Sequence, residues 1–155
     1  MSDSGKLTHA TVVARAGAGV LIQGASGAGK SDLALRLIAT PLTGLHPHTF
    51  SLVADDQVLL SRADNGVMAH APDTIAGRLE VRGLGIVSLP ALQAIRIELI
   101  VGLAAAHEIE RMPKTGRAEI LGVKIPMIRL YPFEPSAPAK VALALNRVCG
   151  CQPPG

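Results

Sequence analysis

The sequence is poor in aromatic residues. Tryptophan is absent, and two phenylalanines and one tyrosine make up only 2% of the 155 residues. The core of the fold must therefore be built from Val, Leu, Ile and Ala. Single-stranded nucleic acids are usually bound by stacking bases on aromatic side chains, so this scarcity argues against that function. The net charge of +3 comes from scattered Lys and Arg, which indicates a mildly basic surface and no nucleic-acid partner.

Long apolar runs and a secretory signal are also missing. No apolar stretch approaches the ~20 residues that span a bilayer, and the N-terminal Met-Ser-Asp-Ser-Gly-Lys lacks the apolar region of a signal peptide. The two cysteines, Cys149 and Cys151, form a Cys-x-Cys pair with no further cysteine to complete a metal site. We therefore expect a soluble cytoplasmic protein with no membrane contact and two ordinary thiols in a reducing compartment.

The length suits one domain, and no linker or internal repeat interrupts the chain. We expect a single domain over 1–155, with an ordered core over 8–148 and a tail over 149–155. Strands are predicted at 8–14, 19–23, 50–54, 95–101 and 123–130, a hairpin pairs 58–60 with 67–69, and helices are expected at 31–39, 89–95 and 139–148. This pattern predicts an α/β fold whose mixed sheet adds antiparallel hairpins to a parallel nucleotide-binding unit.

A glycine-rich loop lies between a predicted strand and a predicted helix, and it matches the phosphate-binding pattern G-x-x-x-x-G-K-[ST] in full. Its residues are Gly24, Ala25, Ser26, Gly27, Ala28, Gly29, Lys30 and Ser31. In such a loop the backbone N–H groups face phosphate oxygens, and the helix adds its positive N-terminal end. Lys30 is expected to reach the β- and γ-phosphates, and Ser31 to bind Mg²⁺. A glycine-rich turn without a ligand is the alternative, which the strand–loop–helix context disfavours.

Two acids, Asp55 and Asp56, directly follow the apolar strand predicted at 50–54. Successive side chains of a strand point to opposite faces, so we expect the two carboxylates to differ in role. One can serve the metal of a nucleotide site while the other faces the acceptor. A simple NTPase needs only one acid, so the second suggests a general base for a hydroxyl acceptor. The alternative is that one of the two only caps a turn.

A third stretch, Leu-Glu-Val-Arg-Gly-Leu-Gly-Ile at 79–86, places Glu80 and Arg82 on one face if it is a strand. An acid and a base beside a flexible turn can complete a metal–phosphate site, although a surface ion pair before a loop gives the same pattern. The histidines do not show the spacing of metal ligands, and most are expected to be solvent-exposed. This expectation concerns His46, His48, His70 and His107.

Taken together, these features resemble the catalytic domain of bacterial HPr kinase/phosphorylase. In that family a histidine opens the domain, and here His9 precedes the loop at 24–31, Val-Ala-Asp-Asp at 53–56 and the stretch at 79–86. The last stretch is specific to the family, because a generic P-loop protein has no reason to carry it. The resemblance extends from about Thr8 to Val101. It implies a P-loop core with a mixed sheet, similar to that of phosphoenolpyruvate carboxykinase.

The resemblance implies a short form of this enzyme, an ATP-dependent protein serine kinase that acts on the phosphocarrier protein HPr. Lys30 and the glycines of the loop would hold the phosphates of ATP, or pyrophosphate. Ser31 and Glu80 would bind Mg²⁺, with Asp55 close by. Regulation of the phosphotransferase system would be the cellular role.

The resemblance also implies the chemistry. Asp56 would take the proton from the acceptor serine and return it in the reverse reaction, and His9 would assist. Arg111 falls where the family has an active-site arginine. Two other functions stay open: a P-loop nucleotide-dependent regulatory switch without kinase activity, and a small-molecule kinase, for which no substrate-closing lid is evident.

The chain departs from the family pattern in two places. Typical members have an additional N-terminal domain, whereas this chain begins directly at the kinase domain. They also carry a basic Gly-Arg-Asn-like stretch near the C-terminus that is important for removing phosphate. Here that region offers only Arg129 and Lys140, separated by three prolines and Glu134. We therefore expect weak phosphorylase activity, and the family's homo-oligomer and the identity of the acceptor stay open.

Overall fold

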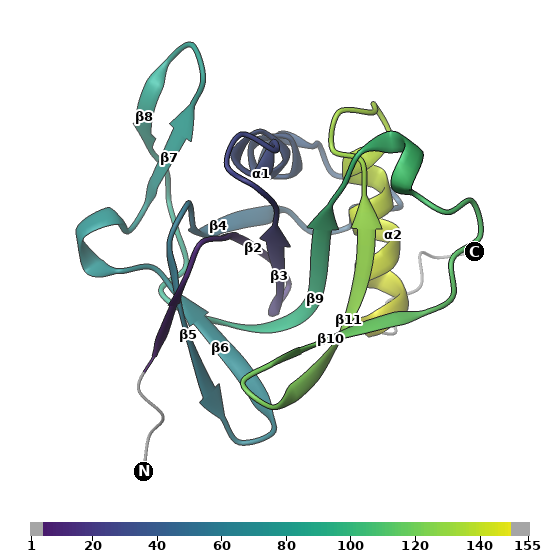
Figure 1. Ribbon diagram of the computed structural model, residues 1–155. Helices are drawn as coiled ribbons and strands as arrows, with labels where there is room; N and C mark the ends of the chain where they lie inside the picture. Colours follow the sequence, from purple (N-terminus) through teal and green to yellow (C-terminus); the bar gives the residue numbers. More distant parts are fainter. Residues whose placement is uncertain (1–4, 150–155) are drawn as a thin grey trace.

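The computed structural model describes residues 5–149, which form a mixed α/β fold (Figure 1). The strands are β1 (Lys6–Thr8), β2 (Thr11–Arg15), β3 (Ala18–Gln23), β4 (Phe50–Ala54), β5 (Val58–Ala63), β6 (Gly66–His70), β7 (Arg78–Val81), β8 (Gly85–Ser88), β9 (Ile95–Leu103), β10 (Gly116–Ile120) and β11 (Val123–Leu130). The helices are α1 (Lys30–Ala39) and α2 (Ala137–Cys149), with single 3-10 turns at Asp73–Ile75 and Ala106–Glu108.

A nine-stranded sheet organises the molecule, in the order β1-β5-β6-β9-β3-β2-β4, with β11 and then β10 attached to β9. Strands β3, β9 and β11 are parallel to one another, and the remaining pairs of this sheet are antiparallel. Strand β9 is the centre of this arrangement because it pairs with β3, β6 and β11. The predicted mixed sheet, a parallel unit extended by hairpins, is confirmed.

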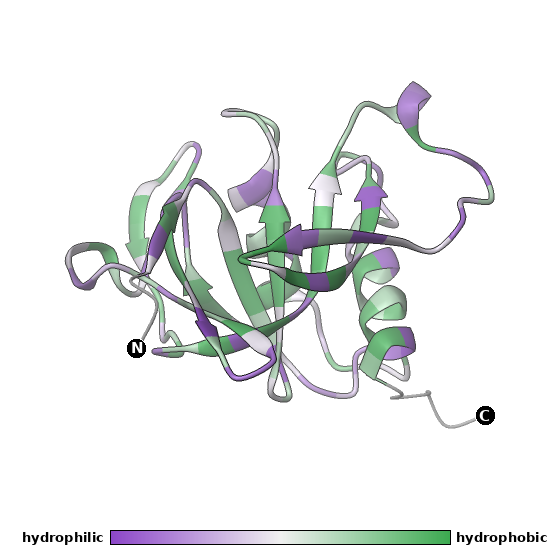
Figure 2. Ribbon diagram, turned by 60° about the horizontal axis from the view of Figure 1, so that its bottom comes forward, coloured by the Kyte–Doolittle hydropathy of each residue, from purple (hydrophilic) through white to green (hydrophobic). Residues whose placement is uncertain are grey.

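Both faces of the central strands are buried, so consecutive residues of one strand enter different cores. Val13 packs among residues of α1 and α2, whereas its neighbour Val12 packs toward β5 and β6 on the other face. Leu99 and Ile100 of β9 are divided in the same way. Strands that are buried on both sides read as continuous apolar runs, and Figure 2 shows the middle of the sheet as mostly hydrophobic. This double burial fixes the end of β3, from which the glycine-rich loop departs.

Strands β7 and β8 form a separate two-stranded hairpin that stands away from the main sheet beside α1 (Figure 1). Leu79 anchors it because this side chain is fully buried, whereas Leu84 and Ile86 near the tip are exposed. The hairpin contains the stretch at 79–86. These residues lie beside the start of α1 and form one wall of the cleft described below.

Most predicted elements are present, among them the hairpin around Asp64-Asn65, which joins β5 to β6 with Ala63 opposite Gly66. The helix expected at 139–148 begins two residues earlier and ends one residue later, at Cys149. Residues 150–155 of the expected tail lie outside the described residues. Of the residues described, no helix has the length and apolar character needed to cross a membrane.

The helix expected at 89–95 is wrong. This segment runs extended beside β4, where Ala91 forms a parallel bridge with Leu52 and the N–H of Leu92 donates to the carbonyl of Leu52 at 2.9 Å. Pairing with a sheet edge thus replaced a short helix whose propensity is weak in isolation. Strand β10 was not predicted, because Gly-Arg-Ala-Glu-Ile becomes a strand only through its pairing with β11.

His46 is an exception to the solvent exposure that is expected for most of the histidines. It is buried, and its ring meets Phe50 edge-on with centroids 5.9 Å apart. Burial lowers the pKa of His46 because it disfavours the charged form, and the nearby Arg15 cation lowers this pKa further. This histidine is therefore part of the buried packing around Phe50 of β4.

Gly19 allows β3 and β9 to approach closely, which gives a test of the fold. A Cβ at this position would lie 2.7 Å from the carbonyl oxygen of Arg96, which is backbone and cannot swing aside. We expect Gly19→Ala to lower the free energy of unfolding by about 1–3 kcal/mol, the usual cost of overpacking. Urea denaturation measures this loss. Gly44→Ala is the control, since no atom lies within 4 Å of its added Cβ; equal stability of the two variants would contradict this packing.

Candidate active site

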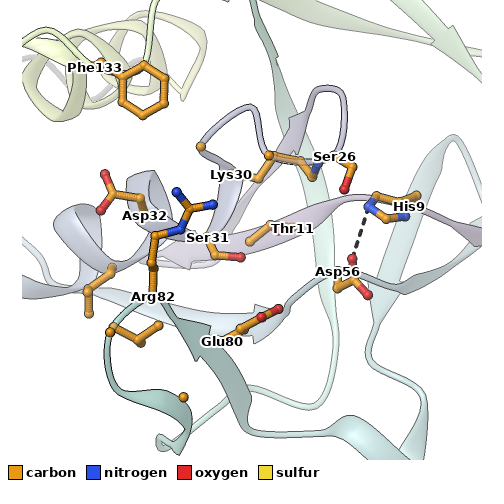
Figure 3. A pocket seen from close by; sticks show the side chains of 16 residues that line it. His9, Thr11, Ser26, Lys30, Ser31, Asp32, Asp56, Glu80, Arg82 and Phe133 are labelled. Atoms are coloured by element: carbon orange, nitrogen blue, oxygen red, sulfur yellow. Dashed lines mark ion pairs between the residues drawn. The ribbon is translucent and has the colours of Figure 1, made fainter.

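A cleft of about 790 Å³ opens between the glycine-rich loop and the β7–β8 hairpin. This volume is typical of small-molecule sites. Its walls are the junction of β1 with β2, the loop after β3, the first turns of α1, the turn after β4, the hairpin, and Phe133 from the segment after β11 (Figure 3). Segments far apart in the sequence thus meet at one place.

The loop at 24–31 leads from β3 into α1, which begins at Lys30. Gly29 caps the helix with φ 104°, a left-handed conformation that side chains other than glycine rarely adopt. A Cβ here would also lie 3.0 Å from Cζ of Phe133. The helix start and the loop therefore have the form of an anion site, in which free N–H groups and the helix dipole favour negative charge.

Lys30 is buried in this structure, and its ammonium is folded over the loop. Nζ donates hydrogen bonds to the carbonyl oxygens of Gly24 and Ala25, both at 2.9 Å. These two bonds hold the charge at the floor of the cleft, where an anion on the loop would meet it. The assignment of Lys30 to the β- and γ-phosphates stays a prediction.

Asp55 joins three elements through its carboxylate. Oδ1 accepts from the hydroxyl of Thr11 at 2.9 Å and from that of Ser31 at 2.6 Å, and Oδ2 accepts from the backbone N–H of Glu80 at 3.1 Å. The side chain is buried, and a buried carboxylate requires donors of this kind. Thr11 lies on β2, Ser31 on α1 and Glu80 on β7, so Asp55 fixes their relative positions.

The oxygen atoms beside Asp55 are suitable ligands for Mg²⁺, which prefers hard oxygen ligands. When phosphates supply some of these ligands, Mg²⁺ takes only a few from the protein. Ser31 donates its only proton to Asp55, which leaves its oxygen lone pairs open to a cation. The carboxylate of Glu80 faces the space between Ser31 and Asp56 (Figure 3). Within residues 5–149 no three His, Cys, Asp or Glu side chains cluster, so the protein alone does not form a complete cage.

Asp56 lies on the opposite side of the turn from Asp55 and is largely exposed. Its Oδ1 is 3.1 Å from Nε2 of His9, and the two side chains keep 60% and 54% of their accessible surface. The backbone holds the pair together, since the N–H of Ala10 donates to the carbonyl of Asp56 at 3.2 Å. Asp56 itself has φ 71°, a left-handed conformation that turns its carboxylate away from that of Asp55.

The structure brings most of the predicted site residues together. Glu80 and Arg82 line the cleft with the glycine-rich loop, although Arg82 lies in the turn after β7 and not in the strand. Arg111 is exposed in the segment between the second 3-10 turn and β10, and the described lining of the cleft does not include it. Its role therefore stays a prediction.

Four lining residues were not predicted from the sequence: Thr11, Asp32, Leu35 and Phe133. Thr11 could have been identified from the sequence, because a threonine at the start of the apolar run Thr-Val-Val-Ala, which is buried in the fold, needs a hydrogen-bond partner. Phe133 carries no motif, and only the fold brings it from the far end of the sequence to Gly29.

The hydroxyl of Thr11 gives a test of the Asp55 network. We expect Thr11→Val, which keeps the shape but removes the donor, to lower the free energy of unfolding by about 1–3 kcal/mol, because a hydrogen bond to a buried charge is lost. Chemical denaturation measures this change. Thr8→Val on the edge strand β1 is the control, with an expected change within about 0.5 kcal/mol. A Thr11→Val protein as stable as this control would show that the bond to Asp55 contributes nothing.

Sequence comparisons find curated relatives of this chain. The HPr kinase/phosphorylase of Malacoplasma penetrans (strain HF-2) is 37% identical over an alignment of 139 residues, with coverage of 82% of this chain and 43% of that protein. The HPr kinase/phosphorylase of Chloroherpeton thalassium is 33% identical over an alignment of 152 residues, with coverage of 89% of this chain and 42% of that protein. The chain thus spans less than half the length of these curated relatives.

A solved structure, the Hpr(Ser) kinase/phosphatase from Coxiella burnetii, shares the fold with a TM-score of 0.76. The match covers 92% of this chain and 95% of that one at 24% sequence identity. The family model described as the HPr serine kinase C-terminal domain matches residues 3–142. Since that match takes in nearly the whole chain, the protein belongs to the HPr serine kinase C-terminal domain family.

Proposed function

We propose that this protein is an ATP-dependent protein serine kinase whose acceptor is an HPr-like phosphocarrier protein. One observation carries the proposal: Asp56, with His9 beside it, is an exposed carboxylate at the end of the cleft that lies beyond Lys30 and Ser31 (Figure 3). A site that only bound a nucleotide would need the loop and Asp55 but not a second, solvent-facing acid. The names of the curated relatives support HPr as the acceptor.

The two halves of the cleft have different tasks in this proposal. The loop N–H groups, the N-terminus of α1 and Lys30 bind the phosphates of ATP and compensate their charge. Ser31, Glu80 and, through Ser31, Asp55 would hold Mg²⁺, which supplies charge stabilisation at the transferring phosphoryl group when it is bound. Much of the catalysis then comes from positioning, which the hydrogen bonds of Asp55 provide.

Asp56 acts on the acceptor. Its carboxylate takes the proton from the serine hydroxyl as the serine oxygen attacks the γ-phosphorus and the bond to the leaving ADP oxygen breaks. His9 holds the carboxylate in place through its 3.1 Å contact. Because both side chains are exposed, a serine on a protein loop can reach them without any opening of the fold.

The decisive experiment is incubation with labelled ATP, Mg²⁺ and purified HPr, followed by identification of the labelled residue. We expect label on a serine, and Asp56→Asn should reduce transfer by ~10² or more while nucleotide binding is kept. Asp64→Asn is the matched control, because Asp64 is another aspartate with positive φ but lies in the β5–β6 turn.

Near-normal transfer by Asp56→Asn would assign the proton to Asp55 or water. ATP binding with no transfer by the unmodified protein to any phosphocarrier would instead favour a nucleotide-dependent switch.

We also propose that phosphorolysis is weak, the reaction in which inorganic phosphate attacks the phosphorus of serine-phosphorylated HPr and the serine oxygen leaves, giving unphosphorylated HPr and pyrophosphate. The cations near the C-terminal segment are already used: Arg129 is 3.3 Å from Glu108, and Lys140 forms an ion pair with Glu134. Neither cation lines the described cleft. An incoming inorganic phosphate would therefore have to displace a carboxylate to gain either of them.

Phosphorolysis is tested by offering serine-phosphorylated HPr with excess inorganic phosphate and following pyrophosphate. We expect release to be slower than the forward transfer by about tenfold or more, a loss that corresponds to about 1.4 kcal/mol of phosphate stabilisation. The forward assay on the same preparation is the control for active enzyme. Pyrophosphate release as fast as forward transfer would show that a basic C-terminal stretch is not needed.

A further inference from the structure

Phe133 is placed unusually for this sequence. The chain has three aromatic residues with Phe or Tyr side chains. Phe50 is 4% exposed in the core, whereas Phe133 is 56% exposed and lines the cleft. Leaving a large apolar side chain in water forfeits the stabilisation that burial would give. A sequence that can spare few aromatic residues thus presents one of them to the candidate active site.

The ring of Phe133 is held in place from several sides. Tyr131 meets it edge-on, with ring centroids 5.8 Å apart and an interplanar angle of 76°. The Cζ and Cε1 atoms of Phe133 lie against Gly29, at 3.0 and 3.1 Å from the position that a Cβ of residue 29 would take. Arg36 of α1 donates a hydrogen bond to the carbonyl of Pro132, next to the ring in sequence. Phe133 is therefore held against α1 at two places, the N-cap residue Gly29 and, through Pro132, Arg36 in the last turn, and it presents a fixed surface.

The position of Phe133 fits one part of the proposed substrate. Phe133 and the His9–Asp56 pair lie at opposite ends of the cleft, with Lys30 and Ser31 between them (Figure 3). A nucleoside triphosphate is an extended molecule with its reacting phosphate at one end and its base at the other. If the phosphates lie on the loop and the reacting end faces Asp56, the base is directed toward Phe133.

We propose that Phe133 is the stacking platform for the nucleobase. The base lies against the Phe133 ring above the first turns of α1, where Leu35 adds a second apolar surface. This inference rests on the proposed nucleotide binding and deepens it, because it assigns the base to a residue outside the glycine-rich loop. Stacking on an aromatic face is a general way to bind bases and needs no specific hydrogen bond.

Calorimetric titration with Mg²⁺-ATP and with Mg²⁺-tripolyphosphate, which has the phosphates but no base, tests the proposal. We expect Phe133→Ala to weaken ATP binding by on the order of tenfold and to leave tripolyphosphate binding within about twofold. Phe133→Trp should restore ATP binding. Lys30→Ala should weaken both ligands, since it removes a phosphate contact. Leu42→Ala, an exposed apolar residue outside the described cleft lining, is the control and should change neither affinity.

Each other outcome overturns the inference. Equal loss of ATP and tripolyphosphate in Phe133→Ala would mean that the ring acts only by supporting Gly29. Unchanged ATP affinity in that variant would place the base elsewhere. If the unmodified protein bound neither ligand, the proposed nucleotide function would fail, and this result is distinct from a selective effect of Phe133.

Discussion

The carboxylate of Asp55 is the interaction on which the site depends. It is buried, so its charge must be met by donors, and the three donors come from β2, α1 and β7. A buried charge with incomplete hydrogen bonding is costly, so this requirement forces the three elements into one arrangement. The glycine-rich loop and the hairpin that faces it are thus positioned by the same side chain.

Two adjacent acids can differ so strongly because the backbone changes conformation between them. Strand β4 ends at Ala54, and Asp56 has a positive φ that directs its carboxylate to the open side of the cleft. The N–H of Gln57 donates to the carbonyl of Asp55 at 2.8 Å and closes this tight turn. Strand alternation predicted that the two carboxylates differ in direction, but both acids follow the end of β4, and the turn at Asp56 separates them.

The sequence was informative where the pattern is local. The glycine-rich loop and the start of α1 follow from neighbouring residues, because a strand, a glycine turn and a helix each have their own signature. Phe133 and strand β10 obtain their roles only from partners distant in sequence, so no local pattern predicts them. The prediction of a helix at 89–95 was wrong for the same reason, since pairing of this segment with Leu52 outweighs a weak local preference for helix.

The attachment of the β7–β8 hairpin has a consequence for the cleft as a whole. The hairpin does not pair with a strand of the main sheet. Its contacts with the rest of the fold include the buried side chain of Leu79 and the hydrogen bond from the Glu80 N–H to Asp55. Asp55 bonds in turn to the hydroxyl of Ser31. Asp55 also bonds directly to the wall that carries Glu80 and Arg82, through the N–H of Glu80. One carboxylate therefore connects the first turn of α1 to the opposite wall of the cleft and sets the distance between them.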